Sequence, residues 1–420
     1  MIFKHDTDLK RTNQNISPEQ IFMMSALLVS AGNYFYNLVL GRVLGPEKFA
    51  DAAIMITFLL VLSFVAMTFQ LVTAKFSIIF ENVLLNTFIS NTYRSALIVG
   101  LFSGLSVVFF SSELQRFFQT TSSSMFVVFG AGIPFYFLMS VNRGIFQGKK
   151  ELTFLSITYQ LEMISRLLIT FGLLYFLQIE SSLLIAIGIF FSFLFGLIPF
   201  NVKAISFFNT CKLDKPHLTI VRNFFKITAF YELTQIIINN SDILLVKHYF
   251  EPYNAGLYAC LALIGRVVYF IAWMYVMLLL PKVIALKKEG KKTHTVLFKY
   301  VGNTVFLSCV IIIISAVYPE TIIQLLFGER YLQISLLLWK YALATSLFAI
   351  SNIFAYYYLS LEKYIPVVIS GAFGVLQVCL IIWFHDTLEQ VVHMQIISMF
   401  ILLLVQLLFY GVGSRPSYFF

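Results

Sequence analysis

The chain has little charge for its length. Only 12% of its 420 residues are Asp, Glu, Lys or Arg, whereas about a quarter of a soluble globular protein is charged. Hydrophobic residues make up 59%, and apolar runs of about 20 residues, long enough to cross the hydrocarbon core of a bilayer, recur from end to end. No stretch is long and polar enough for a separate soluble domain. The composition therefore predicts an all-α integral membrane protein.

Cysteine and histidine are also scarce. The four cysteines lie far apart and match no CxxC or metal-ligand spacing, and the six histidines are scattered. We therefore expect no disulfide, no metal site and no cofactor. No nucleotide-binding loop, Ser–His–Asp spacing or HExxH occurs, and the longest outer connections are too short to carry catalytic groups, so we expect no enzyme. The basic residues form no compact patch, which argues against a nucleic-acid partner.

The apolar runs define about twelve transmembrane helices, and the basic residues orient them. With the amino terminus inside, most of the 29 Lys and Arg residues fall in cytoplasmic segments, as the positive-inside rule requires. Both termini should be cytoplasmic, in a multi-pass protein of the cell (inner or cytoplasmic) membrane. Residues 76–91 have the period of an interfacial amphipathic helix. The spans are expected near 18–44, 49–74, 93–112, 123–147, 153–177, 181–201, 222–247, 253–281, 296–318, 331–359, 363–384 and 389–412.

Six of these helices lie on each side of a polar connector at the midpoint, which suggests a duplication. A shift of 206 residues superimposes Pro46 on Pro252 and Asn33 on Asn239. Two six-helix bundles in the same orientation are the plan of a transporter, with its substrate site between the lobes near the midplane and one lobe rocking against the other. The expected parts are an N-terminal lobe over 1–208, a cytoplasmic linker over 209–221 and a C-terminal lobe over 222–420.

Polar residues form one stripe down the predicted helix 222–247. Glu232, Gln235, Asn239 and Asp242 are spaced 0, 3, 7 and 10, which places them within an arc of about 80°. A carboxylate at membrane depth is costly, so such residues face a cavity or a partner. The stripe is either a hydrogen-bond network between helices or the wall of a wet cavity. Its two carboxylates favour the cavity.

Other polar residues are expected at the same depth. Asn33 and Asn37 repeat the stripe in a milder form on the first helix. Arg266 has no acid at pairing distance on its own helix, so it needs either Asp242 or an anionic ligand. Asp242 accordingly pairs with Arg266 or carries a coupling proton, because burial favours the neutral form of a carboxyl group.

The remaining intramembrane charges have alternative interpretations. Glu162 and Arg166 are spaced i, i+4, and either neutralise each other or line the cavity. Lys340 has no local partner, but it lies close enough to the outer end of its helix to extend toward the headgroups. Cations in the cavity would bind a phosphate-like group. Four cations near helix ends are expected to contact lipid headgroups; they are Arg42, Lys75, Arg143 and Lys247.

Three stretches carry a family resemblance. They are NYFYNLVLGRVLGPEKFADAAIMITFLL (33–60), NNSDILLVKHYFEPYNAGLYACLALIGRVV (239–268) and LLFGERYLQISLLLWKYALATSLFAI (325–350). They resemble the polysaccharide-transport or oligosaccharide flippase proteins of the multidrug/oligosaccharidyl-lipid/polysaccharide exporter superfamily. The likeness covers nearly the whole chain in order and is most specific around Pro252 and Gly256. Ala50 is a departure, since the family usually has a glycine in that part of the first lobe.

The resemblance implies a V-shaped alternating-access transporter of two six-helix lobes. It further implies a flippase that moves polyprenyl-pyrophosphate-linked oligosaccharide from the cytoplasmic to the outer leaflet by ion-coupled alternating access, for cell-surface polysaccharide synthesis. Membrane lipids and a polysaccharide polymerase or glycosyltransferase are the implied partners. A cation-coupled multidrug exporter of the same superfamily is the alternative, although it would need an acid-dominated pocket. The side chains expected to bind substrate are Arg266, Arg166, Lys340, Asn33, Asn37, Gln235 and Asn239. Those expected to couple ions are Asp242, Glu232 and Glu162.

Overall fold

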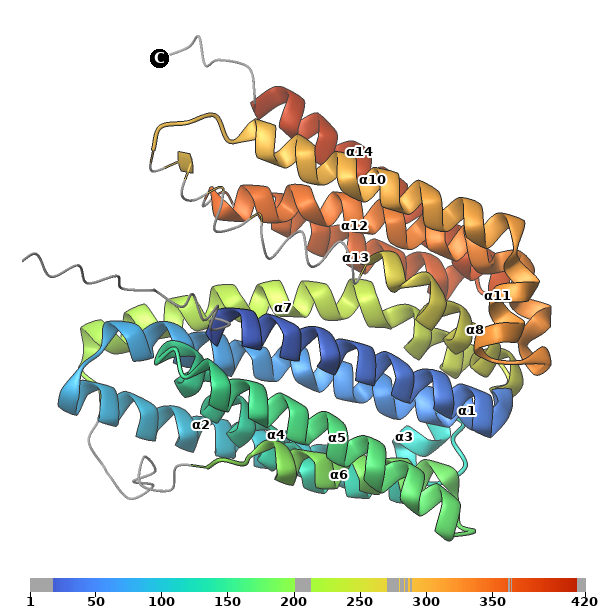
Figure 1. Ribbon diagram of the computed structural model, residues 1–420, viewed down its shortest axis with the longest axis horizontal. Coiled ribbons are helices and arrows are strands. Elements are labelled where there is room, and N and C mark those ends of the chain that lie inside the picture. Colours follow the sequence, from blue (N-terminus) through green and yellow to red (C-terminus); the bar gives the residue numbers. More distant parts are fainter. Residues whose placement is uncertain are drawn as a thin grey trace, which may run out of the picture.

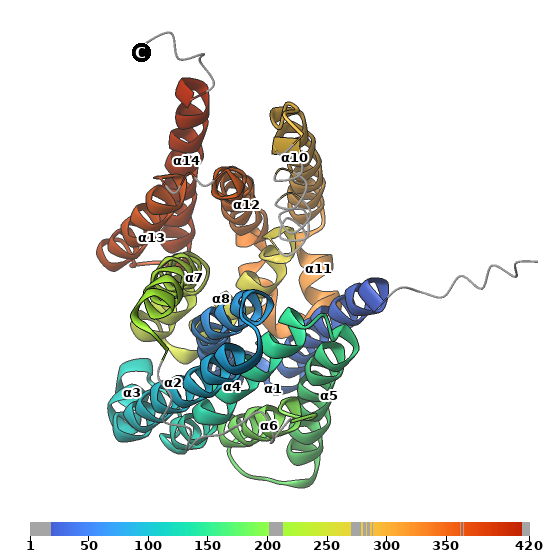
Figure 2. The same cartoon turned by 90° about the vertical axis from the view of Figure 1, so that its left-hand side faces the viewer.

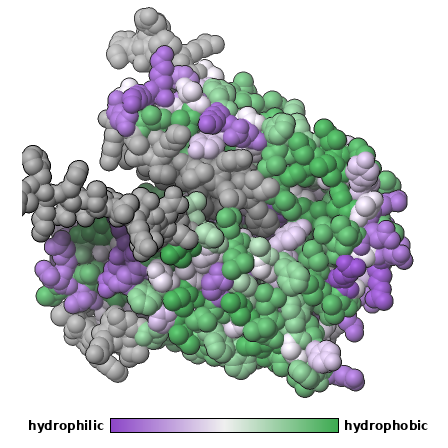
Figure 3. Space-filling view, in the orientation of Figure 1, coloured by the Kyte–Doolittle hydropathy of each residue, from purple (hydrophilic) through white to green (hydrophobic). Residues whose placement is uncertain are grey.

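The computed structural model describes residues 18–200, 213–269, 279, 283, 286–287, 289–361, 363 and 365–413. These residues are mostly helical, and no strand occurs among them (Figure 1). Helices satisfy their own backbone hydrogen bonds, which a bilayer core without water requires. Eight of the described helices are long and apolar enough to cross a membrane. Figure 3 shows a hydrophobic belt between two hydrophilic ends, as a membrane-spanning protein needs.

The first lobe begins with α1, Pro18–Ile79, which consists of two helical arms that run in opposite directions (Figure 1). The arms join at Gly45, whose φ of 76° and ψ of 171° suit a residue without a Cβ. Pro46 follows, where its missing N–H costs no helical hydrogen bond. The arms correspond to the first two predicted spans. The lobe continues with α2 (Asn82–Phe109), α3 (Ser111–Phe118), α4 (Ser124–Gly148), α5 (Leu152–Phe176) and α6 (Ser181–Gly196).

The interfacial helix predicted over 76–91 is wrong. Residues up to Ile79 continue α1, and residues from Asn82 onward belong to α2. The apolar side chains expected to contact the membrane surface pack against one another instead. Phe76, Phe80 and Phe88 are buried, and their ring centroids lie 5.2 to 5.7 Å apart. The ends of two packed helices have the same apolar period as one helix lying on a membrane, so the pattern did not distinguish them.

The second lobe repeats this plan. Its first helix, α7 (Lys215–Tyr249), begins within the segment expected as a linker, and residues 201–212 lie outside the described part. Pro252 begins the following helix as Pro46 begins the second arm of α1. The lobe comprises α7, α8 (Pro252–Gly265), α10 (His294–Val317), α11 (Pro319–Leu326), the 3₁₀ helix η2 (Glu329–Leu337), α12 (Leu338–Ser360), α13 (Ile365–Trp383) and α14 (Leu388–Gly413). With the two arms of α1 counted separately, eleven of the twelve predicted spans correspond to described helices. For the span predicted over 253–281, α8 covers only the first part, and most of residues 270–281 lie outside the described part.

The two lobes form a V that is closed at one end, as predicted. In Figures 1 and 2, α8, α11 and η2 lie against the turn of α1, whereas α10, α12 and α14 diverge from the first lobe toward the opposite end. Tyr331 donates a hydrogen bond to the carbonyl oxygen of Gly41 at 2.7 Å, and Arg42 donates to that of Leu325 at 2.9 Å. We call this the closed end, and the opposite one the open end.

Candidate transport cavity

A cavity lies between the lobes. It consists of two adjoining hollows of about 230 and 470 Å³, and both are lined by Asn33, Asn37, Ile56 and Leu60 of α1. The larger hollow is bounded by α1 on one side and by residues of α7 and α8 on the other. Its wall is mostly apolar, and Asn37 contributes a buried Oδ1 without a hydrogen-bond partner among the described residues. A cavity is therefore present at the place where the sequence predicts the substrate site.

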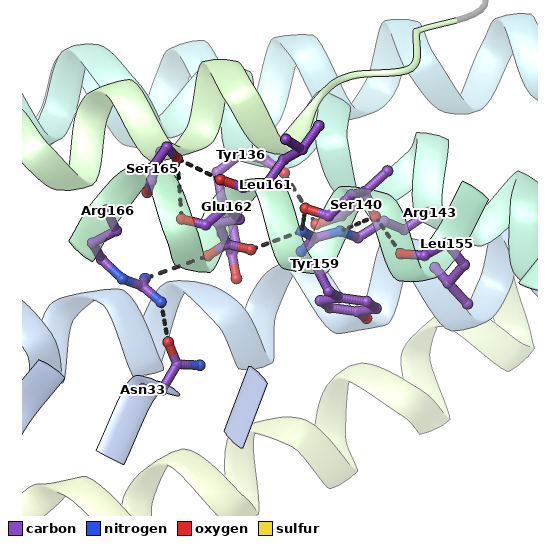
Figure 4. Close-up of polar contacts among 12 residues, drawn as sticks. Asn33, Tyr136, Ser140, Arg143, Leu155, Tyr159, Leu161, Glu162, Ser165 and Arg166 are labelled. Atoms are coloured by element: carbon purple, nitrogen blue, oxygen red, sulfur yellow. Dashed lines mark hydrogen bonds and ion pairs between the residues drawn. The ribbon is translucent and has the colours of Figure 1, made fainter. Parts of the chain in front are cut away.

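The smaller hollow is lined by Arg143, Glu162 and Arg166, which we call the arginine cluster (Figure 4). Arg143 of α4 binds Glu162 of α5 at 2.7 Å, and Arg166 binds the other oxygen of the same carboxylate at 3.4 Å. Arg166 also donates to Asn33 of α1, while Arg143 lies 3.9 Å from the ring centroid of Tyr159. One carboxylate thus holds two arginines, and the cluster has one positive charge more than its acid neutralises.

The pairing of Glu162 with Arg166 expected from the i, i+4 spacing is present, and both residues also line the cavity. The lipid-headgroup contact expected for Arg143 is wrong, because its side chain is only 3% exposed. Its Nε and Nη2 also donate to the Thr158 side-chain and carbonyl oxygens, at 3.1 and 3.0 Å. The sequence carried no signal for this contact, since Glu162 already had a partner on its own helix.

Replacing Glu162 by glutamine should destabilise the first lobe. Arg143 and Arg166, 3% and 5% exposed, would be left without their carboxylate, and breaking a buried ion pair from one side costs about 3–5 kcal/mol. We expect a lower apparent Tm in detergent. Glu151→Gln, at the exposed start of α5, should leave the Tm unchanged. An equal Tm for both variants would contradict a structural role of the arginine cluster.

The second lobe contributes one ion pair, Asp242 with Arg266, at 2.9 Å. Tyr341 and Tyr258 donate hydroxyl hydrogen bonds to the second oxygen of Asp242, at 2.7 and 3.2 Å. Gln395 in turn donates to the Tyr258 hydroxyl at 2.9 Å. The carboxylate side chain is 2% exposed, whereas that of Arg266 is 11% exposed and lines the larger hollow. The pairing of Asp242 with Arg266, one of the two roles that the sequence left open for this carboxylate, is present. Its role as carrier of a coupling proton stays a prediction.

The rest of the polar stripe lies behind this pair. Asn239 lines a small hollow of about 30 Å³ together with Asp242 and Arg266. Gln235, 1% exposed, accepts a hydrogen bond from the Tyr269 hydroxyl at 3.2 Å, and its carbonyl oxygen accepts one from Asn239 at 3.0 Å. Glu232 is buried, and no described residue forms a hydrogen bond or ion pair with it. Part of the stripe is therefore a hydrogen-bond network, and Asn239 and Asp242 reach the small hollow.

Lys340 lies apart from the cavity. At the start of α12 it binds Glu389 of α14, and its Nζ lies 3.3 Å from Nε2 of His393. Neither of the two cavity hollows has Lys340 in its lining. The structure therefore brings Asn33, Asn37, Glu162, Arg166 and Arg266 together around one cavity, and leaves Lys340 outside it.

The charge around the cavity is positive. The described charged residues that line its two hollows are three arginines and one acid, namely Arg143, Arg166, Arg266 and Glu162. Asp242 offsets Arg266 from behind. With these two acids and three arginines counted as ionised, one positive charge is left over. Guanidinium groups in such a site suit phosphate or carboxylate ligands, which they bind through paired N–H donors.

Two helical lobes around a buried charged cavity define a multi-pass membrane transporter. A family model described as "Polysaccharide biosynthesis protein" matches residues 39–336. The chain belongs to this family, in agreement with the resemblance found in its sequence. A search of curated proteins by sequence finds no match.

Solved structures share the fold. A multidrug resistance transporter of the MATE family and the MOP superfamily, inward-facing, is similar with a TM-score of 0.76 and 11% identity over 93% of this chain and 96% of its own. The lipid II flippase MurJ, in an inward closed conformation, has a TM-score of 0.74 and 17% identity over 94% and 88%. An outward-facing MATE family transporter reaches only 0.56, with 14% identity over 94% and 96%.

Proposed function

We propose that the protein is a flippase that carries polyprenyl-pyrophosphate-linked oligosaccharide from the cytoplasmic to the outer leaflet. The observation that carries this proposal is the arginine-rich cavity between two lobes of a polysaccharide biosynthesis family member. A lipid-linked sugar has to move its charged head through the bilayer while its tail stays in the lipid, and a cavity with a surplus positive charge stabilises that head. A polymerase or glycosyltransferase would then use the sugar at the outer surface.

Specific side chains have roles in this proposal. Arg166 and Arg266, one on each side of the cavity, bind the pyrophosphate through their guanidinium forks. Asn33 and Asn37 offer amide groups to sugar hydroxyls, and the unpartnered Oδ1 of Asn37 is free to accept a hydrogen bond. The apolar remainder of the larger hollow accommodates the first part of the prenyl chain. Lys340, outside the cavity, has no part.

The open end faces the cytoplasm in this proposal. The described cations near that end outnumber those near the closed end, as the positive-inside rule requires of a cytoplasmic face. The higher similarity to inward conformations supports the same orientation. The open-end cations are Lys75, Lys149, Lys150, Lys215, Arg222, Lys226, Lys287, Lys291, Lys292, Lys299 and Lys363, and the closed-end ones are Arg42, Lys48, Arg116, Lys247 and Arg330.

Ion coupling follows from competition for Arg266. A pyrophosphate that binds Arg266 weakens its attraction for Asp242, and a buried carboxylate that loses its cation favours protonation. Substrate binding and proton uptake at Asp242 are therefore linked. Release of the substrate outside returns Arg266 to the carboxylate, and the proton leaves Asp242 on the same side. Glu232, buried without a described partner, is a second carboxyl group suited to hold a proton.

The proposal is tested by reconstitution. Purified protein in proteoliposomes should move a fluorescent polyprenyl-pyrophosphate disaccharide between leaflets faster than protein-free vesicles do. A fluorescent organic cation in parallel vesicles tests the multidrug-exporter alternative, which the apolar wall and the MATE-like fold favour. Movement of the cation without movement of the lipid would replace the flippase by that alternative.

The type of cation at position 266 should also matter. Arg266→Ala is expected to lose about tenfold or more of the translocation rate, because a charge-assisted hydrogen bond contributes ~1.5–3 kcal/mol and each 1.36 kcal/mol is tenfold in rate. Arg266→Lys should retain more activity, since it keeps the charge without the fork. Equal loss in both variants would mean that the fork is required; no loss in either would remove Arg266 from substrate binding.

A further inference from the structure

A buried ion pair joins the two lobes at the closed end. Lys247, at the last turn of α7, lies 2.9 Å from the carboxylate of Asp51 in the second arm of α1, and their side chains are 2% and 4% exposed. The expected headgroup contact of Lys247 is therefore wrong. The Lys247 ammonium also donates to the carbonyl oxygen of Gln119, in the α3–α4 connection, at 3.3 Å. A cation from the second lobe thus lies among oxygen atoms of the first.

These oxygens are held by the first lobe itself. The second carboxylate oxygen of Asp51 accepts hydrogen bonds from the backbone N–H and the hydroxyl of Thr121, at 2.9 and 2.8 Å. The Thr121 hydroxyl lies 3.1 Å from that of Ser182, at the start of α6. Thr120 is 7% exposed, and its hydroxyl is buried without a hydrogen-bond partner among the described residues. If Lys247 withdrew, the carboxylate and its neighbouring oxygens would stay in place.

Neighbouring contacts show that α7 is held here as part of the closed end. The His248 ring stacks on Phe117 of α3 with centroids 3.9 Å apart, and its Nδ1 donates to the Phe117 carbonyl oxygen at 2.7 Å. Gln119 donates to the His248 carbonyl oxygen at 3.3 Å. When the closed end opens during alternating access, these contacts between α3 and α7 separate together with the ion pair.

We propose that Asp51, with the Gln119 carbonyl and the Thr121 hydroxyl, forms a site for a small monovalent cation, which the Lys247 ammonium occupies while the end is closed. The donor set consists of oxygen atoms with a single carboxylate, which suits sodium or a proton better than a divalent ion. A cation from outside takes the site when the lobes part, and Lys247 must displace it before they close. This inference rests on the proposed alternating access, but not on the identity of the transported substrate.

Cation binding is coupled to opening because Asp51 loses its counter-charge, Lys247, when the lobes part. In the closed state Lys247 balances its charge, and burying either group alone would cost several kcal/mol. In the open state the carboxylate is stabilised by water or by a cation, so external cation favours the open arrangement by mass action. The two occupants exclude one another, which couples cation binding to the position of the lobes.

The test measures the closed end directly, in purified protein without substrate. Nitroxide labels at Glu180→Cys and Glu320→Cys, both exposed near that end, in a background with the native cysteines replaced, report the distance between the lobes by pulsed electron paramagnetic resonance. Sodium is titrated at fixed pH, and pH is titrated without sodium. We expect either cation to increase the fraction of the long distance, and the two arms identify which ion acts.

The variants separate the proposal from a merely structural ion pair. Lys247→Met should open at lower cation concentration than the parent, since the competing ammonium is gone, and by about tenfold for each 1.4 kcal/mol of competition removed. Asp51→Asn should favour the long distance between the labels without added cation, and this distance should no longer respond to sodium or pH. Glu113→Gln, an exposed acid of α3, is the matched control and should behave as the parent.

Two outcomes would overturn the proposal. One is an unchanged cation midpoint in Lys247→Met, and the other is a cation response that persists in Asp51→Asn. Should either single variant not fold, the charge exchange Asp51→Lys with Lys247→Asp restores the pair, but places the carboxylate away from Thr121. The proposal then requires a weakened cation response, and a parental response would contradict it. Lipid movement in proteoliposomes is scored separately, so failure of the flippase function remains distinguishable.

Discussion

Asp242→Asn is expected to abolish measurable translocation and to lower the apparent Tm. The substitution leaves the Arg266 guanidinium, 11% exposed, without its counter-charge, and breaking a buried pair from one side costs about 3–5 kcal/mol. Tyr341 and Tyr258, which donate to the same carboxylate, would also bind a neutral amide oxygen less strongly. In the proposed mechanism the variant further lacks the carboxyl group that takes a proton when substrate engages Arg266.

A double variant separates folding from transport. Asp242→Asn combined with Arg266→Gln removes both charges, so most of the Tm should return, because replacing a buried pair is far less costly than breaking one. Translocation should stay lost. Recovery of both Tm and translocation would show that the pair is structural alone. Asp386→Asn, an exposed acid between α13 and α14, controls for loss of a carboxylate and should retain full activity.

Gly256→Ala is expected to hold the closed end apart. A Cβ built on Gly256 would lie 1.8 Å from the carbonyl oxygen of Pro46 and 2.5 Å from its carbonyl carbon. Both are backbone atoms, so no side-chain rotation relieves the clash, and α8 has to withdraw from the turn of α1. Overpacking costs about 1–3 kcal/mol, and each 1.4 kcal/mol shifts an equilibrium tenfold. The arrangement in which this end is closed should lose about that free energy relative to the arrangement in which it is open.

The measurement is the distance distribution between labels on Glu180→Cys and Glu320→Cys, which should move toward the long distance. Gly172→Ala and Gly302→Ala are matched controls, because a Cβ at either helical position meets nothing within 4 Å. These controls should keep the parental distribution. If Gly256→Ala gave the same distribution as the controls, the contact between α8 and α1 would not determine closure. Translocation should fall with the long-distance fraction, since alternating access needs both states.

The contact also explains why a glycine stands in the second lobe. Ala50 lies at the position equivalent to Gly256 under the 206-residue shift, and it departs from the family pattern. In the structure it is Gly256 that approaches the opposite lobe's backbone, whereas Ala50 is buried in the core cluster. The two lobes have the same plan, but only the second one packs a helix, α8, against the turn of the other lobe. They therefore differ in residue type at these equivalent positions.

The helical architecture follows from the sequence alone. Runs of about 20 apolar residues leave the backbone no alternative to helix in a bilayer, and Pro46 and Pro252 mark the start of the second helix in each lobe. Periodicity failed at residues 76–91, because it reports an apolar face without saying whether lipid or protein covers it. Phe76 and Phe88 pack against one another across the α1–α2 break.

Which charged side chains pair with one another depends on how distant helices pack. The sequence could place Asp242 and Arg266 at membrane depth, but their contact joins residues of two helices, and no local spacing encodes it. Arg143, Asp51 and Lys247 were missed or assigned to headgroups for the same reason, since each finds its partner on a distant helix. Helical periodicity determines the face on which a side chain lies. The packing of helices far apart in sequence determines what that face touches, and hence where the cavity, the arginine cluster and the closed end lie.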